Sequence, residues 1–180
     1  ADNWFMTALD ERNPNEVESA LAALGQGSFG TNAMQFDRKF GEGLLARMTR
    51  DDARAHAAFI AARVEQEKVV KAQPDFGPAW CMLGLIDAGL GKKEEALREG
   101  RRAIELQPAA SDAISGTDMV NYFAIIAAWV GEKELACQYL QTARALPGSW
   151  LLSYGQLKLN PIWDPLRGDP CFENMVASLA

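Results

Sequence analysis

Four side chains of this chain could hold a metal ion or act as a nucleophile or base: Cys81, Cys137, Cys171 and His56, the one histidine. The cysteines are odd in number, no two form a CxxC pair, and the histidine is remote from all three in sequence. Structural zinc sites use four such ligands at short, regular spacings, so the sequence predicts no metal site. We expect buried or half-buried free thiols rather than a disulfide, which favours the cytoplasm over the periplasm or the extracellular space. The histidine lies in an alanine-rich helical pattern and is expected to be structural or exposed, not catalytic.

A glycine-rich stretch, GQGSFG at residues 25–30, resembles the phosphate-binding loop of protein kinases, and residues 75–77 spell the kinase motif DFG. A kinase glycine loop connects two strands, whereas the preceding ESALAAL at 18–24 has a helical composition. The HRD catalytic loop is absent, and 180 residues are too few for two kinase lobes. We therefore expect this stretch to connect two helical units and to bind no phosphate.

No other catalytic set stands out, and we expect the chain not to be an enzyme and to need no cofactor. Its net charge of −6 argues against nucleic acid as a partner, because that partner requires a basic surface. The most apolar runs are AFIAARV at 58–64 and FAIIAAWV at 123–130. Both are far shorter than the ~18 residues that span a bilayer, so we expect no membrane insertion.

The elements that carry these residues are helices, because apolar residues recur at helical spacing in pairs of segments separated by short turns. The clearest pair covers residues 78–108, with its turn at 91–92. Its landmark residues are Trp80, Leu83, Gly84, Ala96, Gly100 and Ala103. The small residues at 84 and 96 predict a close helix crossing, with the tryptophan and the leucine buried beside it.

This pattern resembles the tetratricopeptide repeat, a helix–turn–helix unit of about 34 residues. Asp87 stands where the family usually has tyrosine, and Gly100 where it usually has a large aromatic residue. The resemblance implies an all-α fold, an α-solenoid in which antiparallel helix pairs stack into a ribbon with one concave and one convex side.

A common spacing predicts about four such pairs. In each, a small residue on the first helix precedes an alanine on the second by twelve residues: Ala8 and Ala20, Gly41 and Ala53, Gly84 and Ala96, Ala124 and Ala136. We place the pairs at residues 1–24, 34–72, 77–107 and 117–146 of a single domain covering 1–180. The small residues of the first helices recur at intervals of 33, 43 and 40, so only the geometry within a pair is regular.

The tail, residues 149–180, differs from the pairs because it is rich in proline. Asp169 and Pro170 have the form of an N-cap and first residue of a helix over 171–179, which we expect to cap the last pair. Residues 157–180 resemble the end of tetratricopeptide arrays in bacterial signalling and regulatory proteins. Such arrays often follow a regulatory domain on the same chain, and this chain begins without Met inside an apparent helix, as we would expect of a segment of a longer protein.

In tetratricopeptide stacks the first helices line the concave side and hold peptides or helices, so the resemblance implies a protein-interaction module. The lining positions that it implies are Phe5, Leu9, Arg12, Gln35, Arg38, Glu42, Cys81, Leu85, Ala88, Asp118, Asn121, Ile125 and Trp129. The family's clamp for a terminal carboxylate uses Lys and Asn at such places. Because that clamp is not supplied here, we expect a hydrophobic or amphipathic helical segment as partner.

Two alternatives stay open. In one, the chain's own tail or its long second helix covers part of the lining. In the other, the open ends of the stack pair between copies, which would make the chain a self-assembling scaffold.

Overall fold

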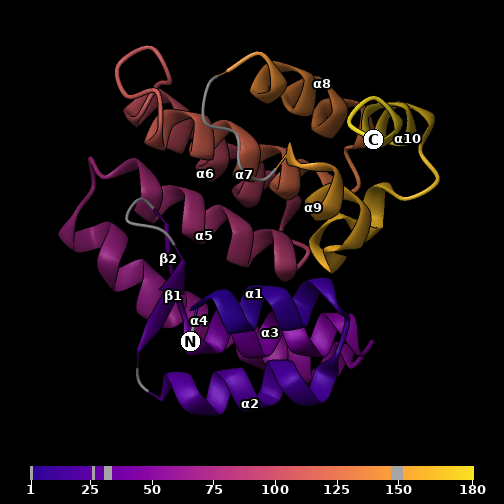
Figure 1. The fold of residues 1–180 in the computed structure, drawn as a ribbon. Helices are drawn as coiled ribbons and strands as arrows, with labels where there is room; N and C mark the ends of the chain where they lie inside the picture. Colours follow the sequence, from indigo (N-terminus) through magenta and orange to yellow (C-terminus); the bar gives the residue numbers. More distant parts are fainter. Residues whose placement is uncertain (1, 26, 31–33, 147–151) are drawn as a thin grey trace.

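The structure, a computed structural model, describes residues 2–25, 27–30, 34–146 and 152–180. This part of the chain is mainly helical and contains one short two-stranded sheet (Figure 1). In chain order the helices are α1 (Asp2–Asp10), α2 (Pro14–Leu24), α3 (Arg38–Met48), α4 (Asp52–Ala72), α5 (Gly77–Gly89), α6 (Lys93–Leu106), α7 (Ser115–Trp129), α8 (Lys133–Arg144), α9 (Tyr154–Leu159), the 3-10 helix η2 (Pro161–Leu166) and α10 (Pro170–Ala177). The strands are β1 (Ser28–Gly30) and β2 (Gln35–Asp37). Among the described helices, none combines the length and the apolar character that crossing a bilayer requires.

The expectation of a mainly α-helical protein is confirmed, and helices α1 to α8 lie in the four segments where the sequence placed helix pairs, except that α7 begins two residues before its segment, at Ser115. Side-chain caps start several of them. The Asp37 side chain accepts a hydrogen bond from the Phe40 N–H at 2.7 Å, and the Asp51 side chain accepts one from the Arg54 N–H at 3.0 Å. Pro14 occupies the first turn of α2, where its missing N–H costs nothing.

The four turns inside the pairs share one backbone geometry. Each has a residue of positive φ two places after its first helix ends: Arg12 (53°), Arg50 (58°), Gly91 (74°) and Gly131 (82°). In each turn the next residue's N–H donates to the carbonyl five residues back, at 2.9–3.0 Å. This pair of features is the Schellman motif, which satisfies the last carbonyls of a helix and reverses the chain.

Aligning the pairs on these turns corrects the predicted register of the first two. The turn residues recur at intervals of 38, 41 and 40, which is more regular than the predicted alignment. Gly84 and Ala124 keep their place, but the equivalent residues are Phe5 in α1 and Gly43 in α3, not Ala8 and Gly41. Ala53, the predicted contact of α4, is exposed, whereas Ala55 at the equivalent position is buried.

The stretch predicted to be a connecting loop contains the first strand, which pairs antiparallel with the second so that Phe29 lies opposite Phe36. Gly30 is required there, because its φ is 121° and a β-carbon would lie 2.1 Å from the Met34 carbonyl oxygen. The second strand also replaces the predicted start of the second pair, so Phe36 is not helical. Both phenylalanines are buried, and the hairpin therefore adds aromatic side chains to the core.

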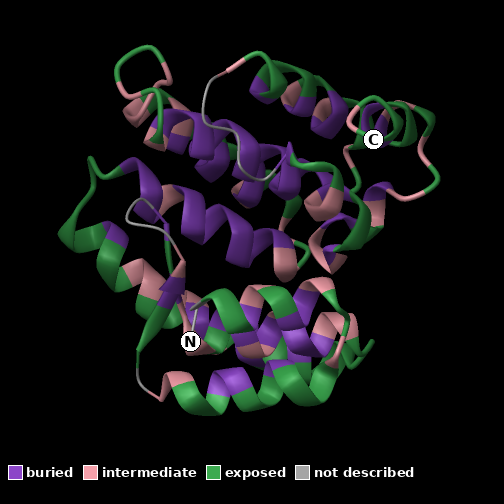
Figure 2. Cartoon of the chain, in the orientation of Figure 1, coloured by how far each residue is buried: buried purple, intermediate pink, exposed green. Residues whose placement is uncertain are grey.

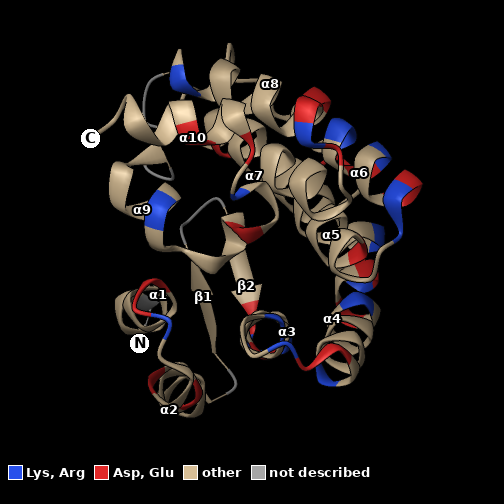
Figure 3. Ribbon diagram, turned by 90° about the vertical axis from the view of Figure 1, so that its right-hand side faces the viewer, with Lys and Arg blue, Asp and Glu red and all other residues tan. Residues whose placement is uncertain are grey.

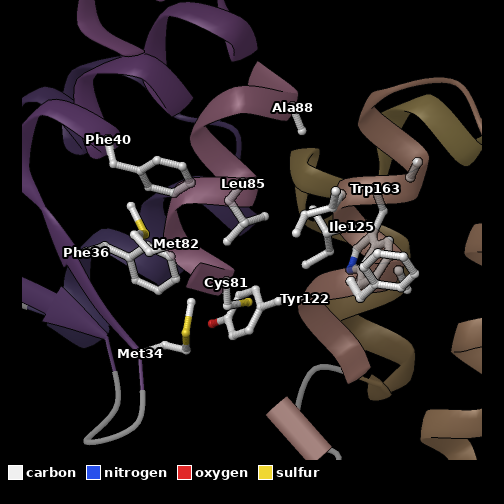
Figure 4. Packing of buried hydrophobic residues seen from close by; sticks show 14 of the residues in the cluster. Met34, Phe36, Phe40, Cys81, Met82, Leu85, Ala88, Tyr122, Ile125 and Trp163 are labelled. Atoms are coloured by element: carbon white, nitrogen blue, oxygen red, sulfur yellow. The ribbon is translucent and has the colours of Figure 1, made fainter. Parts of the chain in front are cut away.

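Helices α5 and α7 are buried on nearly all sides, whereas the other helices have exposed faces (Figure 2). Their outer sides pack on α6 and α8 and on each other. On the inner side, Phe36 and Met34 of the hairpin region lie beside Met82 and Tyr122 (Figure 4). The same core includes Trp163 of the tail, which is fully buried. Hairpin and tail together therefore fill the inner side of pairs three and four.

The tail links pair four to pair one. In Figure 3 the helix pairs follow one another around the hairpin, and α9 lies between α10 and α1. Arg12 forms an ion pair with Asp164 of η2, and the Asn160 side chain donates to Asp10 at 2.8 Å. As predicted, the Asp169 side chain caps α10 by accepting from the Cys171 N–H. The first three residues of the predicted cap, 149–151, fall outside the described residues.

A disulfide joins Cys137 of α8 to Cys171 of α10. The expectation of free thiols is therefore wrong for these two residues, whose pairing depends on how the tail folds back and not on their spacing in sequence. Cys81 is a free, buried cysteine as expected. The disulfide also removes the cysteine-based reason for expecting a reducing compartment.

Candidate functional site

The described part of the chain contains a mainly apolar cavity of about 540 Å³ on the inner side of the helix pairs. Its walls come from α1, the hairpin, α3, α7 and the tail. The lining includes Met6 and Leu9 of α1, Phe40, Leu44 and Arg47 of α3, and Trp129 of α7. Cavities of 300–1,000 Å³ with mostly apolar and aromatic walls and a few polar groups are the usual form of ligand sites.

Helix α3 forms one wall because its sequence has two different faces. Phe40, Leu44 and Arg47 follow a spacing of four and three residues, which places them on one side of the helix. The small Gly43 lies on another side, where a β-carbon would come within 2.6 Å of the Phe59 ring of α4. Because α3 packs closely on α4 through Gly43, the face with Phe40, Leu44 and Arg47 is directed into the cavity.

Aromatic rings build the part of the cavity next to the hairpin. The Phe36 ring lies 5.3 Å from Phe29, 5.1 Å from Phe40 and 5.6 Å from Tyr122, measured between ring centroids. These distances are typical of favourable aromatic pairs. The rings come from the hairpin, α3 and α7, so the wall depends on all three elements being in place.

Trp129 continues this wall and is held by the tail. Its indole N–H donates to the Ile162 carbonyl of η2 at 2.9 Å, and its ring stacks on Phe40 with centroids 6.4 Å apart. The Arg47 guanidinium lies 4.2 Å from the centre of the Trp129 ring, a cation–π contact. Burial lowers the pKa of Arg47, although the nearby charges of Asp52 and Asp164 act in the opposite direction.

The carboxylate of Asp164 is already satisfied by the chain. It accepts from Arg12 at 3.0 Å and from Arg167 at 2.8 Å. Burial acts to raise its pKa, but the hydrogen bonds from the two arginines outweigh this and lower it. The tail is thereby fastened to α1 at the edge of the cavity.

Of the predicted lining residues, Leu9 and Trp129 line the cavity. Seven others are buried in the chain's own core and do not line the cavity: Phe5, Cys81, Leu85, Ala88, Asp118, Asn121 and Ile125. The others are at or near the surface: Gln35, Arg12 in its ion pair with Asp164, and Arg38, which pairs with Glu42 at 2.9 Å within α3. The alternative that the tail covers part of the lining agrees with this burial, and the hairpin covers a further part.

The cavity residues that the sequence-based prediction missed are found when the helix pairs are aligned on their turns. The predicted positions of α5, Cys81, Leu85 and Ala88, lie ten, six and three residues before the turn residue Gly91. The same offsets before Arg12 and Arg50 give Asp2, Met6 and Leu9 in α1, and Phe40, Leu44 and Arg47 in α3. Met6, Leu9, Phe40, Leu44 and Arg47 all line the cavity. The signal was thus present in the sequence, but two arginines occupied turn positions where glycine was expected.

The remaining reactive groups lie outside the cavity. Burial raises the pKa of the Cys81 thiol far above its usual range, so this thiol is a poor nucleophile. His56 is exposed on α4. In the described residues, one group of metal-type side chains comes together, Cys137, Asp169 and Cys171, and its two sulfurs are joined to each other.

Comparisons of this chain with protein-family models, with curated proteins and with solved structures found no match.

Proposed function

We propose that this chain is an interaction module without catalytic chemistry, which binds a short peptide or helical segment of a partner protein in the inner cavity. The observation that carries the proposal is the cavity itself. Its walls are mainly apolar, it lies on the inner side of the first helices, and the chain's own tail borders it without filling it. The equivalent residues of α1 and α3 line it, as repeat proteins use equivalent residues to build one binding surface.

The same proposal takes the helix pairs to be a stack of the tetratricopeptide type. Four turns of the same geometry at nearly equal intervals support this, and so do the small residues at Gly84 and Ala96. The resemblance of the tail to the ends of bacterial arrays further suggests a signalling or regulatory protein as the setting.

The size of the cavity limits what enters it. A volume of about 540 Å³ is in the range of drug-sized ligands and is too small for a complete helix, which is about 10 Å across with its side chains. Two or three apolar side chains on one face of a helix or on an extended segment would fit, as in the helix-in-groove mode of recognition. The rest of the segment would stay outside the cavity.

End-to-end self-assembly is the alternative from the sequence, and it has less support. The disulfide fixes α10 beside α8, the second helix of the last pair, and Arg144 of α8 also donates to the Ser178 hydroxyl after α10 at 2.7 Å, so the tail takes up space at this end of the stack.

A display selection of random short peptides tests the proposal. The wild-type chain is compared with Leu44→Trp, which fills the cavity, and with Ile60→Trp, a matched change at an exposed position of α4. We expect the selection to enrich peptides with apolar anchor residues. These peptides should bind the wild type and the Ile60→Trp variant equally well, and should no longer bind the Leu44→Trp variant. Equal binding to all three folded chains would contradict the proposal.

A further inference from the structure

We propose that the segment bound in the cavity carries an Asp or Glu next to its apolar anchors, and that this carboxylate pairs with Arg47. The inference rests on the proposed function and adds the charge of the ligand to it. It follows from the position of Arg47 in the repeat, from its surroundings and from its orientation.

The position is apolar in every other pair. Three residues before the turn residue, α1 has Leu9, α5 has Ala88 and α7 has Ala128, whereas α3 has Arg47. Leu9 and Arg47 both line the cavity, on α1 and α3. A guanidinium in place of a small or aliphatic side chain costs desolvation, so its presence among apolar walls requires a compensating partner.

The chain supplies only part of that compensation. In the residues that the structure describes, none of the ion pairs within 4.0 Å involves the Arg47 guanidinium. Asp164 is engaged by Arg12 and Arg167, and Asp52 is exposed in the first turn of α4, where the helix dipole stabilises it. The charged form of Arg47 is favoured by the cation–π contact with Trp129 and, at longer range, by the charges of Asp52 and Asp164, but burial outweighs these charges and lowers its pKa.

The orientation of Arg47 suits a carboxylate. Trp129 is fixed by its hydrogen bond to the Ile162 carbonyl, so the guanidinium lies over a ring that cannot easily turn. An arginine stacked on an aromatic face keeps the N–H groups at its edge free, and these match the two oxygens of a carboxylate. Arg50 also lines the cavity, as do Asp52 and Asp164, and Asp164 is already paired with Arg12 and Arg167.

The test uses peptides selected on the wild-type chain and measures their affinity by calorimetry. In a selected peptide, Glu→Gln is compared on the wild type, on Arg47→Met and on Arg98→Met, the matched change at an exposed position of α6. We expect the change to weaken binding to the wild type and to the Arg98 variant by about tenfold, and to leave binding to Arg47→Met unchanged, since a charged hydrogen bond has this strength. Arg47→Lys keeps the charge but loses the planar guanidinium, so the loss of affinity caused by Glu→Gln on this variant should lie between the losses on the wild type and on Arg47→Met. This variant replaces Arg47→Met in the test if the methionine variant fails to fold.

Each other outcome has a separate meaning. If acidic residues are not enriched, or if Glu→Gln costs the same on the wild type and on the Arg47 variant, this inference is wrong while the proposed function stands. If the peptides bind Leu44→Trp as well as the wild type, the proposed function itself fails. If sodium decanoate binds the cavity and no peptide does, the occupant is a small acid, and the peptide proposal is overturned.

Discussion

A β-carbon on Gly84 would lie 3.1 Å from the carbonyl oxygen of Ala96, so α5 and α6 meet almost backbone to backbone at the point that their small residues predict. The same β-carbon would lie 3.0 Å from Ile126 of α7. Three helices therefore share this contact, and the position has no room for a side chain.

Gly84→Leu should lower the free energy of unfolding by about 3 kcal/mol or more, because the added atoms force the three helices apart. Urea unfolding measures the change. Gly155→Leu in α9 is the control, since a β-carbon there would meet nothing within 4 Å, and it should be neutral or slightly stabilising. Equal losses in the two variants would show that the helix contact at Gly84 is not as close as described.

Trp163→Ala should cost about 3–5 kcal/mol, because this side chain is fully buried between the tail and the core. Trp80, which the sequence pattern placed in the core, is instead half-buried against Val70, Ala79 and Leu83. Trp80→Ala should therefore cost less than half as much. Thermal melts of both variants check the order, and a larger loss at Trp80 would contradict the described packing.

The free energy of unfolding of the wild type should fall as the pH rises towards about 8, because the Glu99 carboxyl loses its proton. Burial raises the pKa of Glu99 to about 8, and the neighbouring charge of Asp87 adds to this. The folded chain therefore binds a proton that the unfolded chain releases at its ordinary pKa of 4.5, and this contribution is complete below that pH and lost as the pH passes the folded pKa.

Glu99→Gln, which mimics the protonated form, should be neutral near pH 4.5 and more stable than the wild type by on the order of 2 kcal/mol above pH 8. Glu105→Gln, an exposed change on the same helix, should show no such trend. Denaturant unfolding across this pH range makes the comparison, and a constant difference between Glu99→Gln and the wild type would refute the assignment.

Reduction of the disulfide should destabilise the chain by about 3–4 kcal/mol, the loop-closure estimate for its separation of 34 residues. A melt with and without dithiothreitol measures this loss. The double variant Cys137→Ser/Cys171→Ser should not respond to the reductant. Thiol titration of the unfolded, unreduced chain should find one free thiol, that of Cys81, and three would contradict the pairing.

Local signals in the sequence were sufficient to place the helices. Proline and aspartate mark helix starts at Pro14 and Asp51, and Gly91 and Gly131 mark two of the turns. The turns at Arg12 and Arg50 have the same geometry without the glycine, so the register of the first two pairs was predicted two or three residues out of place. That shift hid Phe40, Leu44 and Arg47.

The remaining errors concern contacts between residues far apart in the chain. Arg12 meets Asp164 across 152 positions, and nothing in the local pattern of either segment indicates the other. The return of the tail explains the burial of Ile125 beneath Trp163, and the disulfide results from the same return. Repeat patterns describe neighbours along the stack and do not predict what folds back over it.

The most direct measurement is an isotope-filtered NMR experiment on the chain with a selected peptide bound, which detects protons of the peptide that lie close to protons of the protein. We expect contacts from the apolar side chains of the peptide to Met6, Leu44 and the Trp129 ring. Contacts confined to Ile60 and Val64, on the exposed face of α4, would place the peptide outside the cavity and contradict the account.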